Sequence, residues 1–348
     1  MCSSLAKNQN YKVSLVVADG KGNETKNDVN IVDIGAKTGG RISRMTKTVN
    51  KVFKKAVELD VDIYHLHDPE LIPIGIKLKK LGKKVIFDSH EDVPKQILGK
   101  TYLSAPLRQL IGWIFSIYES YACRKFDAII AATPFIRDKF LKINPNTVDI
   151  NNFPLLDELA NTGEWEEKKN EVAYVGSIDK IRGVEEIVEA LKYTQGVRLN
   201  LAGQFSEKVV EEKVKNHHAW LKVNELGMLN RQEVNKVLAK SKVGLVNFLP
   251  APNHIDAQPN KMFEYMSAGL PIVASNFPLW RKIIEGNQCG LCVDPLNPQA
   301  IGGAIQYLVD NSKEAKKMGK NGRKAVENKY NWLIEERKLL KLYKGLLN

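Results

Sequence analysis

The stretch DAQPNKMFEYMSAGLPIV, residues 256–273, holds the pattern from which the fold can be worked out. It begins with an acid, Asp256, in a loop that contains Pro259. Proline fits the first turn of a helix, because a missing N–H costs nothing there. Residues 261–266 then predict a short helix, which a glycine ends, and the apolar residues 272–274 predict a buried strand. This order of loop, helix and strand is one unit of an alternation that continues through the chain.

The same stretch also carries candidate chemistry. Backbone N–H groups in the first turn of a helix have no partner within it, and they suit an anion. Glu264 lies about one turn into the helix, where it could accept hydrogen bonds from a pair of hydroxyls, and seven residues separate it from Asp256. A capped surface helix with a solvated Glu264 would have the same spacing. The residues alone therefore leave both interpretations open.

Length and composition indicate a soluble protein of two domains. The chain has 348 residues, of which 43% are hydrophobic and 26% charged, and this length exceeds the usual size of one domain. No apolar run reaches the roughly 18–20 residues of a membrane span. The polar start does not resemble a secretory signal, so we expect a cytoplasmic protein.

The four cysteines do not form a disulfide framework in a chain of this length. Cys289 and Cys292 make a CxxC pair, but no second pair of metal ligands stands at a suitable spacing. They also fall where a buried strand is expected. Packing, and not zinc binding, is therefore predicted for this pair.

The charge is concentrated in the first half of the chain. The net charge is +12, and residues 1–155 contain 24 Lys and Arg against 16 Asp and Glu. Nucleic acid is one possible partner of a basic protein, but no recognised binding motif is present, so none is expected. An anionic membrane surface or a pyrophosphate-bearing substrate explains the charge equally well.

Strands and helices alternate along the first half, which predicts a doubly wound, mainly parallel sheet. The predicted strands are residues 11–18, 29–34, 62–67, 84–88 and 128–131. The predicted helices are residues 41–58, 71–81 and 105–123, and a further one opened by Thr133-Pro134. The helix at 105–123 is densely apolar. It could pack against the sheet, or it could expose an aromatic patch to a bilayer interface.

Polar groups follow two of these strands, where parallel sheets hold ligands. His67 and Asp68 follow one strand, and His90 and Glu91 follow the next. Either histidine alone could be a structural group, but two such endings in neighbouring units favour a functional site. Asp60-Val-Asp62 is a DxD sequence, a pattern that binds a metal ion in some enzymes. Here it precedes a strand, at the other end of the sheet, and no metal is expected there.

The second half repeats the alternation after a charged junction at residues 151–170. Its predicted strands are residues 171–175, 197–202 and 243–248, and its predicted helices are residues 184–192, 298–309 and 331–346. Gly176-Ser177 forms a turn after the first of these strands, and Arg182 precedes the next helix. A Gly-Ser turn alone is weak evidence of a site.

Four motifs together resemble the retaining glycosyltransferase family 4. The acid-x7-acid pattern followed by YMSAGLPIVAS resembles the donor-site signature of that family, usually Glu-x7-Glu. HLHDPE and FDSHEDVP look like its two amino-terminal motifs, and YVGSIDKIRGVEEIVEAL is similar to the element that holds the nucleotide diphosphate. The resemblance implies the GT-B fold, in which two Rossmann-like domains face each other across a cleft. The implied boundaries are residues 1–155 for the acceptor domain, 156–330 for the donor domain, and 331–348 for a helix that crosses back.

The resemblance also implies roles for individual residues. Gly176 and Ser177 would hold the donor nucleotide, Arg182 and Lys261 would neutralise its diphosphate, and Glu264 would bind the ribose hydroxyls. Asp256 and His90 would act at the transferred sugar, while His67, Asp68 and Glu91 would line the acceptor side. Two positions depart from the family. Asp256 is one methylene shorter than the usual Glu, and Ser177 replaces a frequent Arg, whose charge Arg231 or Lys261 could supply.

The function implied is retaining transfer from a nucleotide sugar, UDP-linked more than GDP-linked, in surface polysaccharide synthesis. The acceptor would be a glycan or a polyprenyl-pyrophosphate-linked sugar at the inner membrane surface, and no metal or other cofactor is expected. The family usually begins with a strand and a loop that have no counterpart before Met1, so a truncated, inactive remnant is one alternative. A sugar-nucleotide epimerase is another. A dehydrogenase is disfavoured, because no G-x-G-x-x-G follows a strand.

Overall fold

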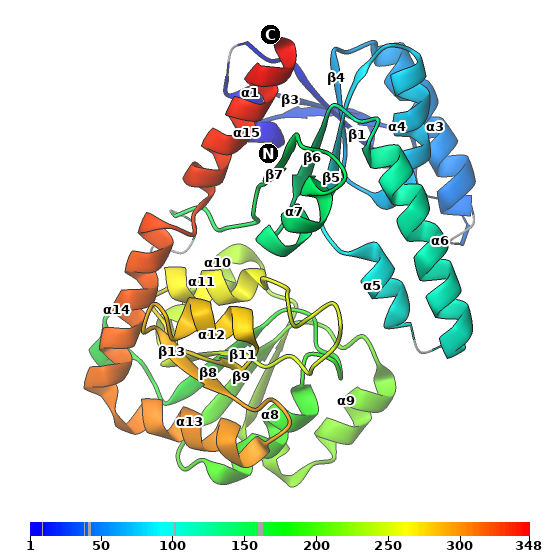
Figure 1. Cartoon of the computed structure of the whole chain (residues 1–348). Coiled ribbons are helices and arrows are strands. Elements are labelled where there is room, and N and C mark those ends of the chain that lie inside the picture. The colour runs from blue at the N-terminus through cyan, green and yellow to red at the C-terminus, as the bar shows by residue number, and fades with distance from the viewer. Residues whose placement is uncertain (9, 38, 41–42, 101, 157, 159–162) are drawn as a thin grey trace. The chain divides into compact units, whose positions relative to one another are not determined.

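The computed structural model describes the chain except residues 9, 38, 41–42, 101, 157 and 159–162 (Figure 1). The chain forms two compact units. Unit 1 comprises residues 1–151 and 333–348, and unit 2 comprises residues 152–332. None of the described helices is long and apolar enough to cross a membrane.

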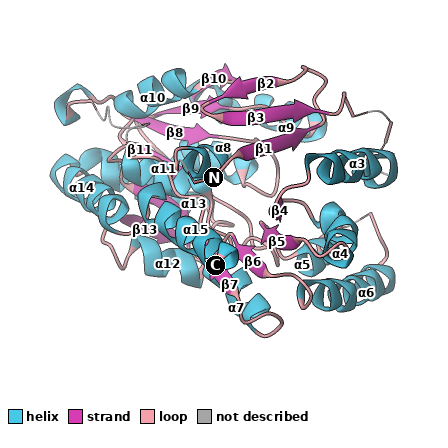
Figure 2. Ribbon diagram, turned by 90° about the horizontal axis from the view of Figure 1, so that it is seen from above, coloured by secondary structure: helices cyan, strands magenta, loops and turns pink. Residues whose placement is uncertain are grey.

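The strands of unit 1 form two sheets, which Figure 2 shows as separate groups. One sheet has the order β1-β3-β2 and the other the order β4-β5-β6-β7. The strands of the first are β1 (Val13–Val17), β2 (Glu24–Lys26) and β3 (Val29–Asp33). Those of the second are β4 (Ile63–Leu66), β5 (Lys84–Ser89), β6 (Ala128–Ala131) and β7 (Thr147–Asp149). The sequence predicts one sheet here, so the two separate groups are a correction.

The second sheet of unit 1 is fully parallel and carries the core of the unit. Residues 85–89 of β5 and all of β6 are buried, because helices cover such sheets on both faces. The helices of unit 1 are α1 (Cys2–Ala6), α3 (Val49–Leu59), α4 (Ile72–Lys80), α5 (Val93–Leu98), α6 (Ala105–Cys123), α7 (Pro134–Leu141) and α15 (Trp332–Leu347).

Two local features of unit 1 differ from the prediction. Strand β2 pairs antiparallel with β3, through a turn in which Asn27 and Asp28 both have positive φ, of 48° and 61°. This is the backbone that a two-residue hairpin needs, and Asn and Asp adopt it most readily after glycine. The predicted helix at 41–58 begins instead as a π-helical turn, Arg44–Thr48, before α3, and residues 41–42 lie outside the described residues.

Helix α6 forms at the predicted residues, but only one of its faces is covered. It packs on α4 and α5 (Figure 1), with Gly112, Glu119, Ala122 and Cys123 buried. The opposite face is apolar and exposed. The helix therefore packs against the core of unit 1 through Phe115 and Tyr118, as one alternative predicts, while Trp113 and Tyr121 are exposed on the other face.

Unit 2 is built on one parallel sheet of order β10-β9-β8-β11-β12-β13. Its strands are β8 (Glu171–Val175), β9 (Arg198–Ala202), β10 (Val223–Gly227), β11 (Val243–Val246), β12 (Ile272–Ser275) and β13 (Gly290–Val293). Its helices are α8 (Val184–Ala190), α9 (Lys208–Lys215), α10 (Arg231–Lys240), α11 (Asn260–Ser267), α12 (Pro278–Ile284), α13 (Pro298–Asp310) and α14 (Ser312–Asn328). The strand order runs outward from β8 in both directions, so the sheet has a switch point between β8 and β11.

Asp60 of the DxD sequence has a structural partner, and Cys289 of the CxxC sequence is buried. Asp60 caps α3 in a left-handed conformation and pairs with Lys83, at the end of β4 opposite to His67. All four cysteines are free thiols. Burial raises the pKa of Cys289 to about 12, which keeps this thiol in its protonated form.

Candidate functional site

The predicted donor-site residues of unit 2 gather at the switch point of its sheet. Gly176 and Ser177 directly follow β8, and Arg182 lies in the loop before α8. Lys261 and Glu264 lie on α11, which follows β11, the neighbour of β8. Ligands of doubly wound sheets bind at the carboxyl ends of strands at such a point. The fold therefore brings these five residues together although 88 positions separate the first from the last.

The turn after β8 requires glycine and leaves its backbone accessible to a close neighbour. Gly176 has φ of +128°, and its N–H donates to the carbonyl of Ala202 at 2.9 Å. A Cβ on Gly203 would lie 1.9 Å from the Gly176 carbonyl oxygen, and one on Gly176 would lie 3.3 Å from the Lys261 ammonium. No larger residue fits either position without moving the turn.

Lys261 is a buried cation. Its residue is 9% exposed, and among the residues that the structure describes its Nζ finds no hydrogen-bond acceptor. The ammonium lies 3.7 Å from the centroid of the Tyr174 ring. Burial, and then repulsion by Arg182, lowers the pKa of Lys261 to about 7. A buried ammonium without an acceptor is costly, and an anion beside it would remove that cost.

Arg182 is held in place by the loop that follows Ser177. Its backbone N–H donates to Asp179 Oδ1 at 2.9 Å, and its guanidinium pairs with the other carboxylate oxygen of that residue. Ser177 Oγ also donates to Asp179, at 3.2 Å. The charge of Arg182 helps to lower the pKa of Lys261, so the two side chains are close enough to interact electrostatically.

Glu264 and Arg231 form an ion pair at the edge of this site. Arg231 Nη1 donates to Glu264 Oε1 at 2.8 Å, and its Nη2 donates to Glu158 Oε2 at 2.7 Å. Arg231 therefore neutralises two carboxylates. Of the two cations that could replace the missing charge at Ser177, Lys261 is the one that contacts the Gly176 turn.

The loop between β11 and α11 contributes one residue that the sequence did not single out. Asp256, the first acid of the motif, is half-buried in this loop. The unpredicted residue is His254, two positions before Asp256. Its ring centroid lies 5.0 Å from that of Phe248. Burial, and then the Arg182 charge, lowers the pKa of His254. Its place in the motif loop was the only signal that could have identified it.

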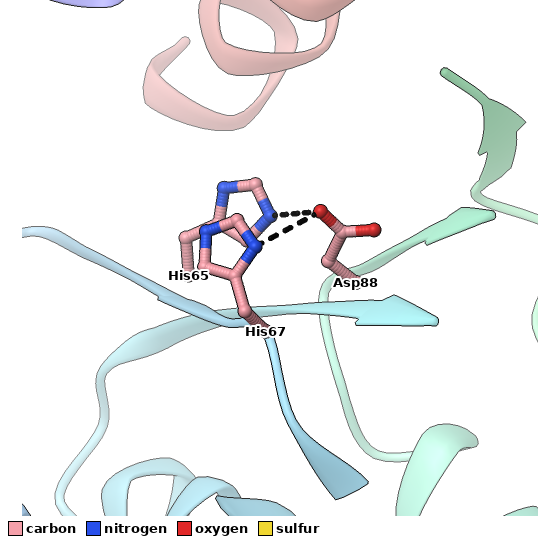
Figure 3. A group of neighbouring side chains, drawn as sticks. All are labelled: His65, His67 and Asp88. Carbon is pink, nitrogen blue, oxygen red and sulfur yellow. Dashed lines mark ion pairs between the residues drawn. The ribbon is translucent and has the colours of Figure 1, made fainter. Parts of the chain in front are cut away.

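In unit 1, the predicted polar residues lie at the ends of β4 and β5. The strands pair in parallel with Leu66 opposite Phe87. Because side chains alternate between the faces of a strand, His65, His67 and Asp88 point from the same face. Figure 3 shows the two imidazoles beside the Asp88 carboxylate. The sequence predicts His67 but neither His65 nor Asp88, because it places both inside buried strands.

The Asp88 carboxylate is the centre of this group. Its Oδ2 lies 3.3 Å from His65 Nε2, 3.2 Å from His67 Nδ1 and 3.5 Å from His90 Nε2. Burial by itself would raise the pKa of Asp88, but the three imidazoles together hold it well below its usual range. The carboxylate is therefore ionised at neutral pH.

The remaining predicted residues of unit 1 act on His90. The contact with Asp88 raises the pKa of His90 against the opposing effect of burial, and Asp68 and Glu91 raise it further. Glu91 itself accepts a hydrogen bond from Gln96, and the carbonyl of Asp68 accepts the first backbone bond of a 3-10 turn, Pro69–Leu71. The surroundings of His90 therefore favour its protonated form.

Comparison with known proteins identifies both halves of the chain. Residues 157–325 match the model of the family described as Glycosyl transferases group 1, and residues 1–150 match that of Glycosyltransferase Family 4. An uncharacterized glycosyltransferase of Methanocaldococcus jannaschii is 24% identical over 293 residues, which are 78% of this chain and 80% of that protein.

A second relative and a solved structure support the same assignment. The capsular polysaccharide biosynthesis glycosyltransferase CapM of Staphylococcus aureus is 23% identical over 51% of this chain and 46% of its own. The structure of Anabaena HepE, solved with UDP and glucose, has a TM-score of 0.71 at 13% identity and covers 92% of this chain and 87% of that one. The likeness shows a shared fold, which is the GT-B fold predicted from the motifs.

Proposed function

Both halves of the chain match glycosyltransferase family models, so the chain is a glycosyltransferase. From this premise we propose that it is a retaining enzyme that transfers a sugar from a UDP-sugar to a glycan acceptor. The acceptor is a lipid-linked glycan of surface polysaccharide synthesis. The observation that carries the proposal is the buried Lys261 ammonium beside Arg182 and the Gly176 turn.

The two cations define what unit 2 would bind. A nucleoside diphosphate supplies the anion that a buried ammonium lacks, and it leaves the reaction with one more negative charge than it had as an ester. Arg182 and Lys261 stabilise that charge from fixed positions in a site with little water, where such interactions are strongest. With two cations provided by the protein, a metal ion on the diphosphate is not required.

The other motif residues take roles around this anchor. Glu264 accepts from the ribose hydroxyls in exchange for part of its ion pair with Arg231. Asp256 binds the transferred sugar, and His90 acts at the same sugar. Retention then follows by displacement on one face of the sugar, because no carboxylate here is an evident covalent nucleophile of the kind that retaining hydrolases use.

The names of the relatives support the choice of donor and acceptor. HepE was solved with UDP, which favours a UDP-sugar over a GDP-sugar. CapM acts in capsular polysaccharide biosynthesis, which favours a surface glycan. Such glycans grow on lipid carriers whose pyrophosphate remains at the membrane, so the enzyme must work at that surface.

The exposed face of α6 supports work at a membrane. The following large apolar side chains of this helix are all exposed: Leu107, Leu110, Ile111, Trp113, Ile114, Ile117 and Tyr121. Their spacing of three and four residues forms one continuous stripe. Lys125 donates to the Tyr121 hydroxyl at 2.6 Å. This hydrogen bond, together with the charges of Lys125 and Lys80, lowers the pKa of the Tyr121 hydroxyl. An apolar stripe that ends in aromatic and basic residues suits an anionic bilayer interface.

Calorimetric titration with UDP, and separately with GDP, tests the donor assignment. We expect UDP to bind and Glu264→Ala to weaken its binding at least tenfold, because the ribose hydroxyls lose their acceptor. Glu285→Ala is the matched control, since Glu285 accepts from Arg281 at 3.1 Å on the exposed surface of the same unit. A folded protein that binds neither nucleotide would overturn the proposal.

The same set of proteins tests the role of His90. With a UDP-sugar and a lipid-linked acceptor, His90→Ala should lower turnover while the affinity for UDP stays near normal. Full transferase activity in this variant would remove His90 from the site.

A further inference from the structure

Three of the six histidines of the chain gather around one buried carboxylate. His65 and His67 come from β4 and the residue after it, and His90 directly follows β5, which carries Asp88. In the part of the chain that the structure describes, His65, His67 and Asp88 are the one group whose His, Cys, Asp or Glu ligand atoms are close enough to hold a metal ion, all within 4.8 Å of one another. Figure 3 shows these three side chains with their ring nitrogens toward the carboxylate.

The polar atoms of this group are not satisfied by hydrogen bonds. The Asp88 side chain is 0% exposed, and neither of its oxygens has a hydrogen-bond partner among the described residues. His65 Nε2 is buried and without a partner in the same sense. The ring nitrogens lie near Asp88 Oδ2, but their directions do not form hydrogen bonds. A buried carboxylate in this condition is costly, and an ion beside it would remove that cost.

The distances match those between the ligands of a tetrahedral metal ion. Ligand atoms about 2.0–2.1 Å from zinc stand about 3.3 Å from one another in a tetrahedron. The separations from Asp88 Oδ2 are 3.3 Å to His65, 3.2 Å to His67 and 3.5 Å to His90. The imidazoles of His65 and His67 are stacked with ring centroids 4.3 Å apart. A rotation of the more exposed His67 ring would bring its nitrogen to the same ion.

The outer nitrogen of His65 has the partner that a metal-binding histidine usually has. His65 Nδ1 lies 2.9 Å from the Tyr343 hydroxyl of α15. When Nδ1 donates to this hydroxyl, Nε2 carries a lone pair that faces the negative Asp88. In this tautomer Nε2 can ligate a cation between the two atoms, and a hydrogen bond on the outer nitrogen is what orients metal-ligating imidazoles.

We propose that His65, His67 and Asp88 bind one divalent transition-metal ion, of which zinc is the best match. Imidazole nitrogens and a carboxylate are the ligands that zinc and cobalt share. The ion would fasten the ends of β4 and β5 and, through Tyr343, the helix α15. This site goes beyond the proposed transfer reaction. Its residues are all in unit 1, whereas the diphosphate-binding residues are all in unit 2, so either can fail alone.

Cobalt(II) titration of the chelator-treated full chain tests the site without any substrate. We expect one ion per chain, with the intense visible bands of tetrahedral cobalt, and displacement of the cobalt by zinc. His67→Ala and Asp88→Asn should each weaken binding at least tenfold, since each removes a ligand. His67 is partly exposed, with 38% of its side chain accessible, so its variant keeps the test decisive if Asp88→Asn does not fold.

The control removes the other close pair of histidines. The rings of His217 and His218 lie 4.5 Å apart in unit 2, and this pair could chelate added metal at the surface. The double variant H217A/H218A should keep the cobalt bands and the affinity. Zinc should also raise the melting temperature of the wild-type chain but not that of His67→Ala. The absence of tetrahedral bands, or equal affinity in wild type and His67→Ala, would overturn the proposal.

Discussion

Lys168 and Lys261 are both buried in unit 2, but among the described residues only the ammonium of Lys168 has hydrogen-bond acceptors. Burial lowers the pKa of Lys168 to about 8, but its ammonium donates to the carbonyls of Leu238 and Ala239 at 3.2 and 2.9 Å. Lys261 is equally buried and has the lower pKa, of about 7, and it contacts an aromatic ring instead of an acceptor. The fold therefore supplies the hydrogen-bond acceptors of Lys168, whereas a bound anion would supply those of Lys261.

We predict that UDP binding takes up a proton at Lys261. Above pH 7 the free protein holds Lys261 mostly as a neutral amine, and a bound diphosphate raises its pKa, so affinity falls as pH rises, by up to tenfold per unit. Between pH 7.5 and 9 the UDP phosphate is fully ionised and adds no proton of its own. Calorimetry in two buffers with different ionisation enthalpies measures the uptake, which should approach one proton.

Lys261→Met is the control for this prediction, because it keeps an unbranched side chain of similar length and removes the titrating group. It should abolish the uptake and weaken UDP binding, with Arg182 unchanged. Without UDP, the pKa of Lys261 is lower in the folded state than in the unfolded state. At a pH between these two pKa values, the unfolded state therefore binds more protons. The free energy of unfolding should therefore rise with pH above 7 in the wild type relative to the variant. Equal proton uptake in both proteins would contradict the assignment.

At the scale of the element, α6 is a helix with two apolar faces, of which one is covered by neighbouring helices. The buried face packs on α4 and α5, and its Glu119 carboxylate is neutralised by Lys139 at 2.7 Å. Trp113, on the other face, is 63% exposed. Exposed apolar stripes of this extent on soluble domains mark an interaction surface, because contact between apolar side chains and water is unfavourable in free energy.

We predict that L110E/I114E abolishes binding to anionic vesicles. Two carboxylates in the middle of the stripe would have to be desolvated in the bilayer interface, and each would also repel anionic headgroups. Co-sedimentation with phosphatidylglycerol vesicles, and separately with neutral ones, measures the effect. The matched control is V209E/L221E, at two highly exposed apolar residues of unit 2. Equal binding by both double variants would show that α6 is not the contact.

At the scale of the whole molecule, the chain leaves unit 1 after residue 151 and returns to it at residue 333. Helix α15 packs into unit 1 through the buried Leu339 and Tyr343. Its buried Glu335 accepts from the backbone N–H of Asn151 at 2.9 Å. The last residues of the sequence thus complete a unit that begins with the first ones.

We predict that Leu339→Ala destabilises unit 1 alone. Removing a fully buried leucine costs about 2–5 kcal/mol in free energy of unfolding. Amide hydrogen exchange should therefore quicken in β4 to β7 and remain unchanged in β8 to β13, because the two units have separate cores. Leu333→Ala, at an exposed position of the same helix, is the control. Faster exchange spread evenly over both units would contradict the assignment of α15 to unit 1.

The sequence alone determined the features that depend on neighbours along the chain. Periodicity placed most strands and helices within two or three residues. The motifs identified the family and singled out Lys261, Glu264 and Arg182 as candidate site residues. These signals are local, since a helix or strand records its buried face in spacings of two to four residues. The hairpin of β2 and β3 also had a local signal, Asn27-Asp28, which the strand pattern obscured.

Only the tertiary structure decided which distant groups meet. It paired Arg231 with Glu264 and left Lys261 beside the Gly176 turn, it joined His65 to Tyr343 across 278 positions, and it covered one apolar face of α6 but not the other. It also divided the strands of unit 1 between two sheets. Contacts between residues so far apart depend on strand order and packing, which spacing along the chain does not record.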